Sequence, residues 1–165
     1  MDRGPADAGA VAWEALVWDL DGTLTLPGRV VPQPGIAAVL AAWARRGTPM
    51  AVATSAGTAT ARRVLDELGW TALFDHVAGS APGVWGKEAV VEEALLGLGR
   101  PLPDGVTGAV VIGDSPGDVD AAHRHGLLAV GVGWGASAAA ALADADLLVT
   151  DPAELAPPDA APRRT

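Results

Sequence analysis

Residues with side chains suited to catalysis or metal binding directly follow several apolar runs of this sequence. Asp19 and Asp21 follow the run 15–18, and Thr54 follows the run 50–53. The complete set is Asp19, Asp21, Thr54, Lys87, Asp114 and Asp118. If the apolar runs are parallel strands, their carboxyl ends share one edge of a sheet, which is where such sheets bind ligands. We therefore expect these residues to converge, although nearly a hundred positions separate the first from the last.

The carboxylates in this set predict a magnesium site. Asp19 and Asp114, with a backbone carbonyl near Asp21, offer only oxygen ligands, which suit Mg²⁺ with several retained waters rather than Zn²⁺. Such a cation screens an incoming phosphate dianion from the carboxylates and lets one of them attack phosphorus. Gly22 directly follows the pair and allows the chain to turn, so that Asp19 and Asp21 can serve different roles.

The segments between these residues alternate between strand-like and helix-like patterns. Ile36, Val39, Leu40 and Trp43 have the i, i+3, i+4, i+7 spacing of an amphipathic helix. Predicted strands cover 15–18, 50–53, 76–78, 108–112, 128–132 and 147–149, and predicted helices cover 34–46, 61–68, 87–97, 117–125 and 137–143. This alternation predicts an α/β fold: a single doubly wound, Rossmann-like domain with a mainly parallel sheet flanked by helices.

Length and composition predict one catalytic domain with short ends. The 165 residues suffice for one ordinary core, half of them are hydrophobic, and no internal repeat is evident. We place the catalytic domain at 13–150, preceded by a flexible segment 1–12 and followed by a Pro- and Ala-rich tail, 151–165, that we expect to be disordered.

Charge and residue usage exclude several classes of function. The absence of cysteine excludes disulfides, thiolate metal sites and cysteine nucleophiles. The net charge of -9 and the lack of an arginine stripe argue against a nucleic-acid partner. No segment approaches a membrane-spanning length or resembles a leader peptide, so we expect a soluble, cytoplasmic protein without a membrane partner.

Four motifs, in order along residues 14–150, resemble those of the haloacid dehalogenase superfamily of phosphohydrolases. The first is Asp19 to Thr25, with Asp19, Asp21 and Gly22 in place. The second is a hydroxyl residue, Thr54, after a hydrophobic strand, and the third is a lysine, Lys87, at a helix start. The fourth is the segment 111–118, which carries Asp114 and Asp118. Segments 31–35, 51–55 and 74–80 resemble the phosphoglycolate-phosphatase branch in particular.

The resemblance implies a reaction through an aspartyl-phosphate intermediate. Asp19 would be the nucleophile, and Asp21 would protonate the leaving oxygen and then activate water. Thr54 would donate a hydrogen bond to a phosphoryl oxygen, and Lys87 would neutralise charge on the nucleophile and the transferring group. Retention of Asp21 favours phosphate-ester hydrolysis, because dehalogenases and phosphonate-cleaving members lack a carboxylate there.

The resemblance also implies the metal and substrate contacts. Mg²⁺ would be held by Asp19, Asp21 and Asp114, with support from Asp118. The backbone amides around Leu20, Asp21 and Ser55 would complete the phosphate cradle.

No gap between the motifs has room for the cap domain that gives capped relatives their specificity. Capless relatives act on phosphates presented by larger molecules or form oligomers in which a neighbour shields the site, so a macromolecular substrate and a homo-oligomer both stay open. We expect a phosphorylated small molecule as the main substrate. Trp85 and Trp134 could line the open site and stack on it.

Two other readings use the same residue types. A response-regulator receiver is a binding module with carboxylates, a Thr and a Lys at strand ends, but its phosphoacceptor lies on a central strand well after its acidic pair. Here Asp19 and Asp21 share the first strand. A non-catalytic scaffold would be expected to have lost a motif residue, and none is lost. A phosphatase that acts on a macromolecule or a carrier-bound group is the principal alternative.

Overall fold

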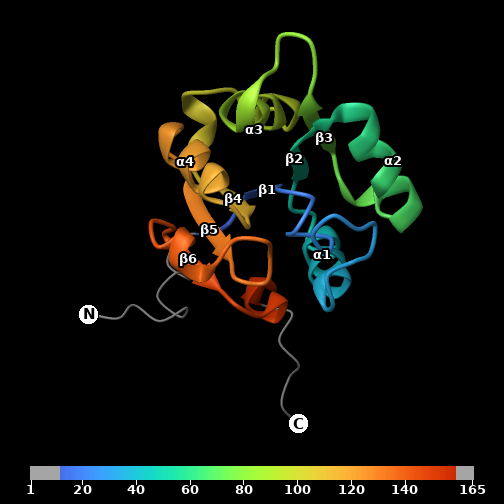
Figure 1. Ribbon diagram of the computed structural model, residues 1–165. Coiled ribbons are helices and arrows are strands. Elements are labelled where there is room, and N and C mark those ends of the chain that lie inside the picture. The colour runs from blue at the N-terminus through green and yellow to red at the C-terminus, as the bar shows by residue number, and fades with distance from the viewer. Residues whose placement is uncertain (1–11, 159–165) are drawn as a thin grey trace.

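The computed structural model describes residues 12–158, and the predicted segment 1–12 lies almost entirely outside them. Strands and helices alternate along this part of the chain (Figure 1). The strands are β1 (Ala15–Trp18), β2 (Met50–Gly57), β3 (His76–Ser80), β4 (Ala109–Gly113), β5 (Leu128–Val132) and β6 (Leu147–Val149). The α-helices are α1 (Ile36–Arg45), α2 (Thr58–Leu68), α3 (Gly86–Gly97) and α4 (Pro116–Arg124). The 3-10 turns are η2 (Thr71–Leu73), η3 (Asp104–Val106), η4 (Ala139–Leu142) and η5 (Pro152–Leu155).

All six strands form one parallel sheet in the order β3-β2-β1-β4-β5-β6. β1 lies between β2 and β4, with Trp18 paired to Val52 on one side and to Ile112 on the other. Because β1 is central, the residues that follow β1, β2 and β4 meet at the same edge. The predicted Rossmann-like fold is confirmed.

Helices cover both faces of the sheet and create two apolar layers. Figure 1 shows α1 and α2 on one side of the strands and α3 and α4 on the other. Strand residues alternate between the layers: Leu16 and Trp18 pack toward α1 and α2, and Ala15 and Val17 pack toward α3 and α4. Strands buried on both faces explain why the sequence shows continuous apolar runs instead of alternation.

The C-terminal region differs from the expectation of a disordered tail that starts at 151. η5 packs against α1, where the indole N–H of Trp43 donates to the carbonyl of Leu155 at 2.8 Å and the Leu155 side chain is fully buried. Asp151 and Glu154 form a reciprocal cap that begins this turn. The ordered structure therefore extends past 150, and residues 159–165 lie outside the described part. The predicted helix at 137–143 is the short turn η4.

Capped relatives carry a cap after the first motif or between the second and third. Within residues 12–158, neither of these two connections holds a cap domain. The loop between β1 and α1, residues 19–35, forms a short flap. The elements α2, η2 and β3 fill most of the stretch between β2 and α3. The expected capless architecture is confirmed for this part of the chain. No helix among these residues is long and apolar enough to cross a membrane.

Candidate active site

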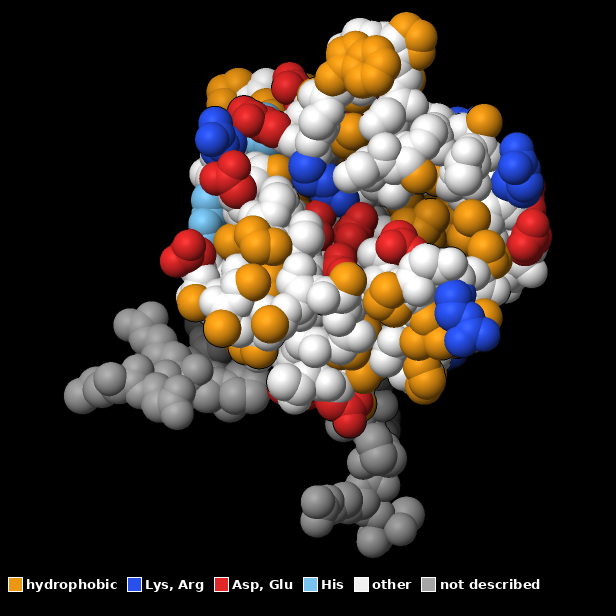
Figure 2. Space-filling view, in the orientation of Figure 1, with side chains coloured by type: hydrophobic (Ala, Val, Ile, Leu, Met, Phe, Trp, Pro, Cys, Tyr) orange, Lys and Arg blue, Asp and Glu red, His pale blue; other side chains and the backbone are white. Residues whose placement is uncertain are grey.

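The predicted site residues gather at the carboxyl edge of the sheet. Figure 2 shows acidic side chains clustered in a hollow at the centre of this face, with a basic side chain beside them. Asp19 follows β1, Asp114 follows β4 and Asp118 lies in the first turn of α4. All three are buried, and one carboxylate oxygen from each lies within 4.8 Å of the others. The sheet order thus brings together the residues that the sequence separates.

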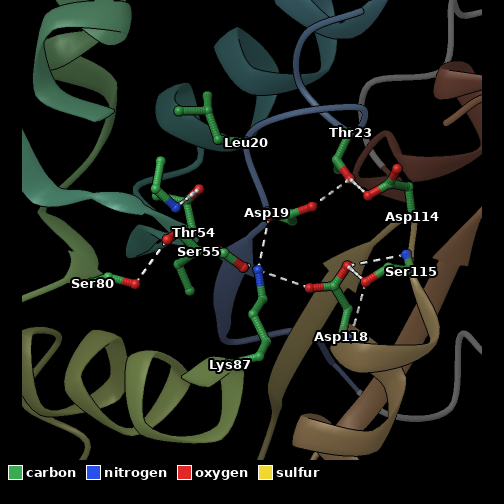
Figure 3. Close-up of polar contacts among 12 residues, drawn as sticks. Asp19, Leu20, Thr23, Thr54, Ser55, Ser80, Lys87, Asp114, Ser115 and Asp118 are labelled. Atoms are coloured by element: carbon green, nitrogen blue, oxygen red, sulfur yellow. Dashed lines mark hydrogen bonds and ion pairs between the residues drawn. The ribbon is translucent and has the colours of Figure 1, made fainter. Parts of the chain in front are cut away.

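Lys87 neutralises part of this cluster. Its Nζ lies 2.8 Å from Oδ1 of Asp19 and 2.8 Å from Oδ1 of Asp118, and it donates to the carbonyl of Ala53 at 2.6 Å (Figure 3). Burial lowers the pKa of Lys87, but the carboxylates of Asp19 and Asp118 outweigh this effect and raise it above its ordinary value. The ammonium therefore stays charged at the bottom of the site.

Asp19 is in a different electrostatic position. Burial raises its pKa to about 7, Lys87 opposes that shift, and the nearby Asp118 carboxylate adds to it. The ammonium of Lys87 contacts two of the three buried carboxylates, those of Asp19 and Asp118 but not that of Asp114. The cluster is left with an excess of negative charge, which costs free energy unless a further cation is present. The cluster therefore fits a divalent cation, and its oxygen-only donors fit Mg²⁺.

Asp118 also contacts Ser115, in addition to Lys87. Its Oδ2 accepts hydrogen bonds from the backbone N–H and the hydroxyl of Ser115, at 3.1 and 2.9 Å. The Ser115 hydroxyl accepts in return from the Asp118 N–H, so the pair forms the capping box of α4. Asp118 thus caps the helix with one oxygen and contacts Lys87 with the other.

Asp21 is not a member of the carboxylate cluster. It is exposed, and its carboxylate accepts a hydrogen bond from the Gly28 N–H in the flap at 2.7 Å. Gly22 has φ of +77° and turns the chain between Asp21 and the buried Thr23. The three carboxylates that lie close enough to hold one cation are those of Asp19, Asp114 and Asp118, and the predicted contact of Asp21 with the metal stays a prediction.

A cleft of about 570 Å³ opens beside Asp19. Its walls come from the end of β1, the flap, and the start of α2. The lining residues predicted from the sequence are Asp19, Leu20, Asp21, Thr54, Ser55 and Asp114. Within residues 12–158 the N–H groups of Leu20 and Asp21 donate to no carbonyl or side chain, so both can bind an anion.

Thr54 and Ser55 lie where the pairing of β2 with β3 shifts register, between Ala53 and Gly57. The Thr54 side chain is buried and accepts from the Ala56 N–H at 3.2 Å. The Ser55 carbonyl accepts from the Ser80 hydroxyl at 2.8 Å. Irregular pairing at this point turns both residues toward the cleft.

The two tryptophans suggested as substrate contacts do not line the cleft. Trp85 is 74% exposed in the loop before α3, and Trp134 packs against the core while its indole N–H donates to the Thr23 carbonyl at 3.0 Å. Trp134 therefore positions the Thr23 turn.

Thr23 is a site residue that sequence reasoning did not single out. Its hydroxyl lies 3.5 Å from Oδ2 of Asp19 and 3.4 Å from Oδ1 of Asp114, and can bridge the two carboxylates. The Ala136 N–H holds the other oxygen of Asp114 at 3.0 Å. The first motif contained Thr23, but only the pairing of β1 with β4 brings it to Asp114.

The parallel sheet, with carboxylates, a lysine and a threonine at its carboxyl edge, defines a Rossmann-like α/β protein with a charged site at that edge. The chain belongs to the haloacid dehalogenase-like hydrolases, whose family model matches residues 26–126. That match includes Thr54, Lys87, Asp114 and Asp118, and Asp19 and Asp21 precede it. The predicted superfamily and the predicted enzyme class, a phosphohydrolase of this type, are confirmed at the level of the family.

Two named proteins have sequences similar to part of this chain. The chain is 41% identical over 102 residues to the tyrosine-protein kinase PtkA of Mycobacterium tuberculosis, which covers 61% of this chain and 34% of PtkA. It is 38% identical over 109 residues to the probable phosphatase IndB of Dickeya dadantii, which covers 66% of this chain and 46% of IndB. The chain thus spans about a third to a half of the length of these relatives.

The fold is shared with a predicted phosphatase from Clostridium acetobutylicum. The two structures superpose with a TM-score of 0.77 and 21% identity, over 87% of this chain and 96% of the other.

Proposed function

We propose that this chain is a magnesium-dependent phosphatase that hydrolyses a phosphomonoester through an aspartyl-phosphate on Asp19. One observation carries the proposal: the carboxylate of Asp19 lies at the end of a central strand, contacts Lys87 at 2.8 Å and borders the cleft that Asp21, Thr54 and Asp114 also line. The relative IndB, a probable phosphatase, supports the same class of reaction.

The first half-reaction forms the covalent intermediate. An oxygen of Asp19 attacks phosphorus while the bond from phosphorus to the substrate oxygen breaks, and the Asp21 carboxylic acid gives its proton to that leaving oxygen. Lys87 stabilises the charge on Asp19 and the transferring group, and the free N–H groups of Leu20 and Asp21 hold phosphoryl oxygens.

The second half-reaction returns the enzyme to its starting state. The Asp21 carboxylate takes a proton from a water molecule that attacks phosphorus, and the bond between phosphorus and Asp19 breaks to release inorganic phosphate. Asp19, Asp114 and the Asp21 carbonyl would hold Mg²⁺, with Asp118 in support, and the bound ion supplies charge neutralisation for the phosphoryl oxygens.

Release of phosphate from small esters tests this function. We expect turnover of simple phosphomonoesters in millimolar Mg²⁺ and a fall of at least ~100-fold in EDTA, because the buried carboxylates repel an unscreened phosphate. Colorimetric assay of phosphate measures both rates, and Mg²⁺ added back after EDTA is the control. Equal turnover with and without the cation would contradict the proposed role of the metal.

A phosphorylated macromolecule is the second candidate substrate. The relative PtkA bears the name of a tyrosine-protein kinase, and residues 12–158 leave the cleft without a cap. A phosphotyrosine peptide assayed beside small esters separates the two candidates: a higher kcat/KM for the peptide would favour the macromolecular substrate.

The glycine after Asp21 offers a test of the Asp114 position. A Cβ built on Gly22 would lie 2.4 Å from Oδ2 of Asp114, and the φ of +77° disfavours any other residue. We expect Gly22→Ala to displace Asp114 and weaken Mg²⁺ binding by ~10- to 100-fold, as loss of a supporting contact does in other metal sites. Titration of activity against Mg²⁺ measures the change.

Gly126→Ala is the matched control for backbone strain. Gly126 also has a positive φ, +76°, but a Cβ there meets nothing within 4 Å. Its substitution should lower stability without changing the Mg²⁺ dependence. An equal shift in both variants would assign the effect to backbone strain rather than to Asp114.

A further inference from the structure

A basic side chain stands in the wall of the cleft. Arg29 lies in the flap, and among the residues that line the cleft it is the only Lys or Arg, whereas three of the lining residues are aspartates. An arginine in a cleft of this charge is positioned to bind an anion other than the phosphoryl group that reacts at Asp19.

The guanidinium of Arg29 has no partner in the part of the chain that the structure describes. No hydrogen bond or ion pair joins it to a residue between 12 and 158, although Asp21 is close in sequence. Arg100 and Arg124 pair with carboxylates, and Arg62 is unpaired within residues 12–158 like Arg29. Its place in the wall of the cleft is what distinguishes Arg29. Arg29 thus has its full set of donors available for a ligand, in a fork that matches a carboxylate or a phosphate.

Backbone hydrogen bonds in the flap fix the position of the Arg29 backbone relative to Asp21. Gly28 makes the turn with a φ of +68° and donates its N–H to the Asp21 carboxylate at 2.7 Å. The Arg29 N–H donates to the Leu26 carbonyl at 3.1 Å, and the Leu26 N–H donates to the Val31 carbonyl at 2.9 Å. The turn that presents Arg29 is therefore anchored on the proposed acid and base.

The remaining wall of the cleft has an apolar part, beside residues that carry hydroxyl groups. Val30 lies in the flap, and Ala61 and Val64 face it from α2, with a cleft volume of about 570 Å³ between the walls. That volume lies within the range of small-molecule sites. A short carbon spacer against these side chains would join a group near Arg29 to a phosphate at Asp19.

Resting on the proposed function, we infer that Arg29 determines specificity by binding a second anionic group on the substrate. The substrate class is then a small phosphomonoester with a carboxylate or a further phosphate at its far end. Because residues 12–158 provide no cap, the flap takes the role of recognising the distal part of the substrate.

Three-carbon phosphomonoesters that differ only at the far end test this inference. The ends are a carboxylate, a second phosphate and a hydroxyl, so the first two also distinguish the two sources of negative charge. Wild type, Arg29→Ala and Arg29→Glu are compared with Arg62→Ala, in which an exposed arginine of α2 that does not line the cleft is removed. Arg29 is exposed, so its substitution should leave folding intact.

We expect Arg29→Ala to lower kcat/KM for at least one anion-ended ester by ~10- to 100-fold, the usual effect of losing a hydrogen bond to a charged group. The hydroxyl-ended ester should be hydrolysed at nearly the wild-type rate. Arg29→Glu should reverse the preference, and Arg62→Ala should retain it. An equal loss on all three esters, or no loss, would overturn the inference.

The same assays distinguish failure of the Arg29 inference from failure of the proposed phosphatase function. Wild-type turnover of the hydroxyl-ended ester shows that the phosphatase activity stands, whatever Arg29 does. If wild type hydrolyses none of the esters, the phosphatase proposal fails, and calorimetry with the corresponding phosphonates decides the inference. Anion-ended phosphonates that bind through Arg29 would support it, and binding that is indifferent to Arg29 would reject it.

Discussion

Asp19→Asn should abolish turnover, with a loss of at least ~10⁴-fold in kcat, as removal of a nucleophile does in other enzymes with covalent intermediates. The amide retains the shape of the side chain but cannot form the acyl phosphate. Phosphate release under saturating substrate and Mg²⁺ measures the loss. Asp120→Asn, on the exposed face of α4, is the control and should remain active.

Stability distinguishes this loss from a folding defect. Burial raises the pKa of Asp19 to about 7, above its ordinary 3.8, so the ionised carboxylate is less favourable in the folded state than in the unfolded chain. Its stabilising contribution is complete below the ordinary pKa and is lost as pH rises through 7. At pH 8 in EDTA, a neutral Asn should therefore melt no lower than wild type. An inactive variant with a much lower Tm would point to a structural role for Asp19.

Much of the sheet could be predicted because its strands are buried on both faces. The apolar runs 15–18, 108–112 and 128–132 each became a strand, within a residue of the expected bounds. The end of the fold was harder to predict, because the Pro-rich composition after 150 resembles a disordered tail. Burial of Leu155 and the Trp43 hydrogen bond are tertiary contacts that no local pattern reports.

The site was predictable in its positions but not in its contacts. Parallel strands must bring Asp19, Thr54 and Asp114 to one edge, so their convergence follows from the fold. The two-sided role of Asp118 and the bridge from Thr23 depend on side-chain directions and on β1 lying beside β4, which the sequence order does not reveal. The flap conformation that places Arg29 in the wall of the cleft depends likewise on the Gly28 turn.

Lys87→Met should lower both activity and stability. Mg²⁺ should restore part of the lost stability but not the lost activity. The side chain is 12% exposed and contacts Asp19, Asp118 and the Ala53 carbonyl. Without the ammonium, buried carboxylates lose their partner, which typically costs about 3–5 kcal/mol of unfolding free energy. We also expect kcat to fall by ~10²- to 10³-fold, the usual cost of losing one group that stabilises transition-state charge.

Differential scanning calorimetry with and without Mg²⁺ measures the stability change. A cation in the cluster replaces part of the lost positive charge, so the rise in Tm on adding Mg²⁺ should be larger in Lys87→Met than in wild type. Arg124→Met removes an exposed cation that pairs with Asp120 and Glu88, and should change stability by no more than ~1 kcal/mol. Identical Mg²⁺ responses in wild type and Lys87→Met would contradict a shared electrostatic cluster.

The chain itself provides an independent probe of this cluster, because Lys87 is its single lysine beside ten arginines. Apart from the terminal amine, an amine-directed reagent can label only the site. The carboxylates of Asp19 and Asp118 raise the pKa of Lys87 and so keep the amine protonated and unreactive. Labelling of the folded protein should therefore be slow and should accelerate in Asp19→Asn, which removes one of the two charges. Unchanged labelling in that variant would show that burial, rather than the ion pair with Asp19, protects Lys87.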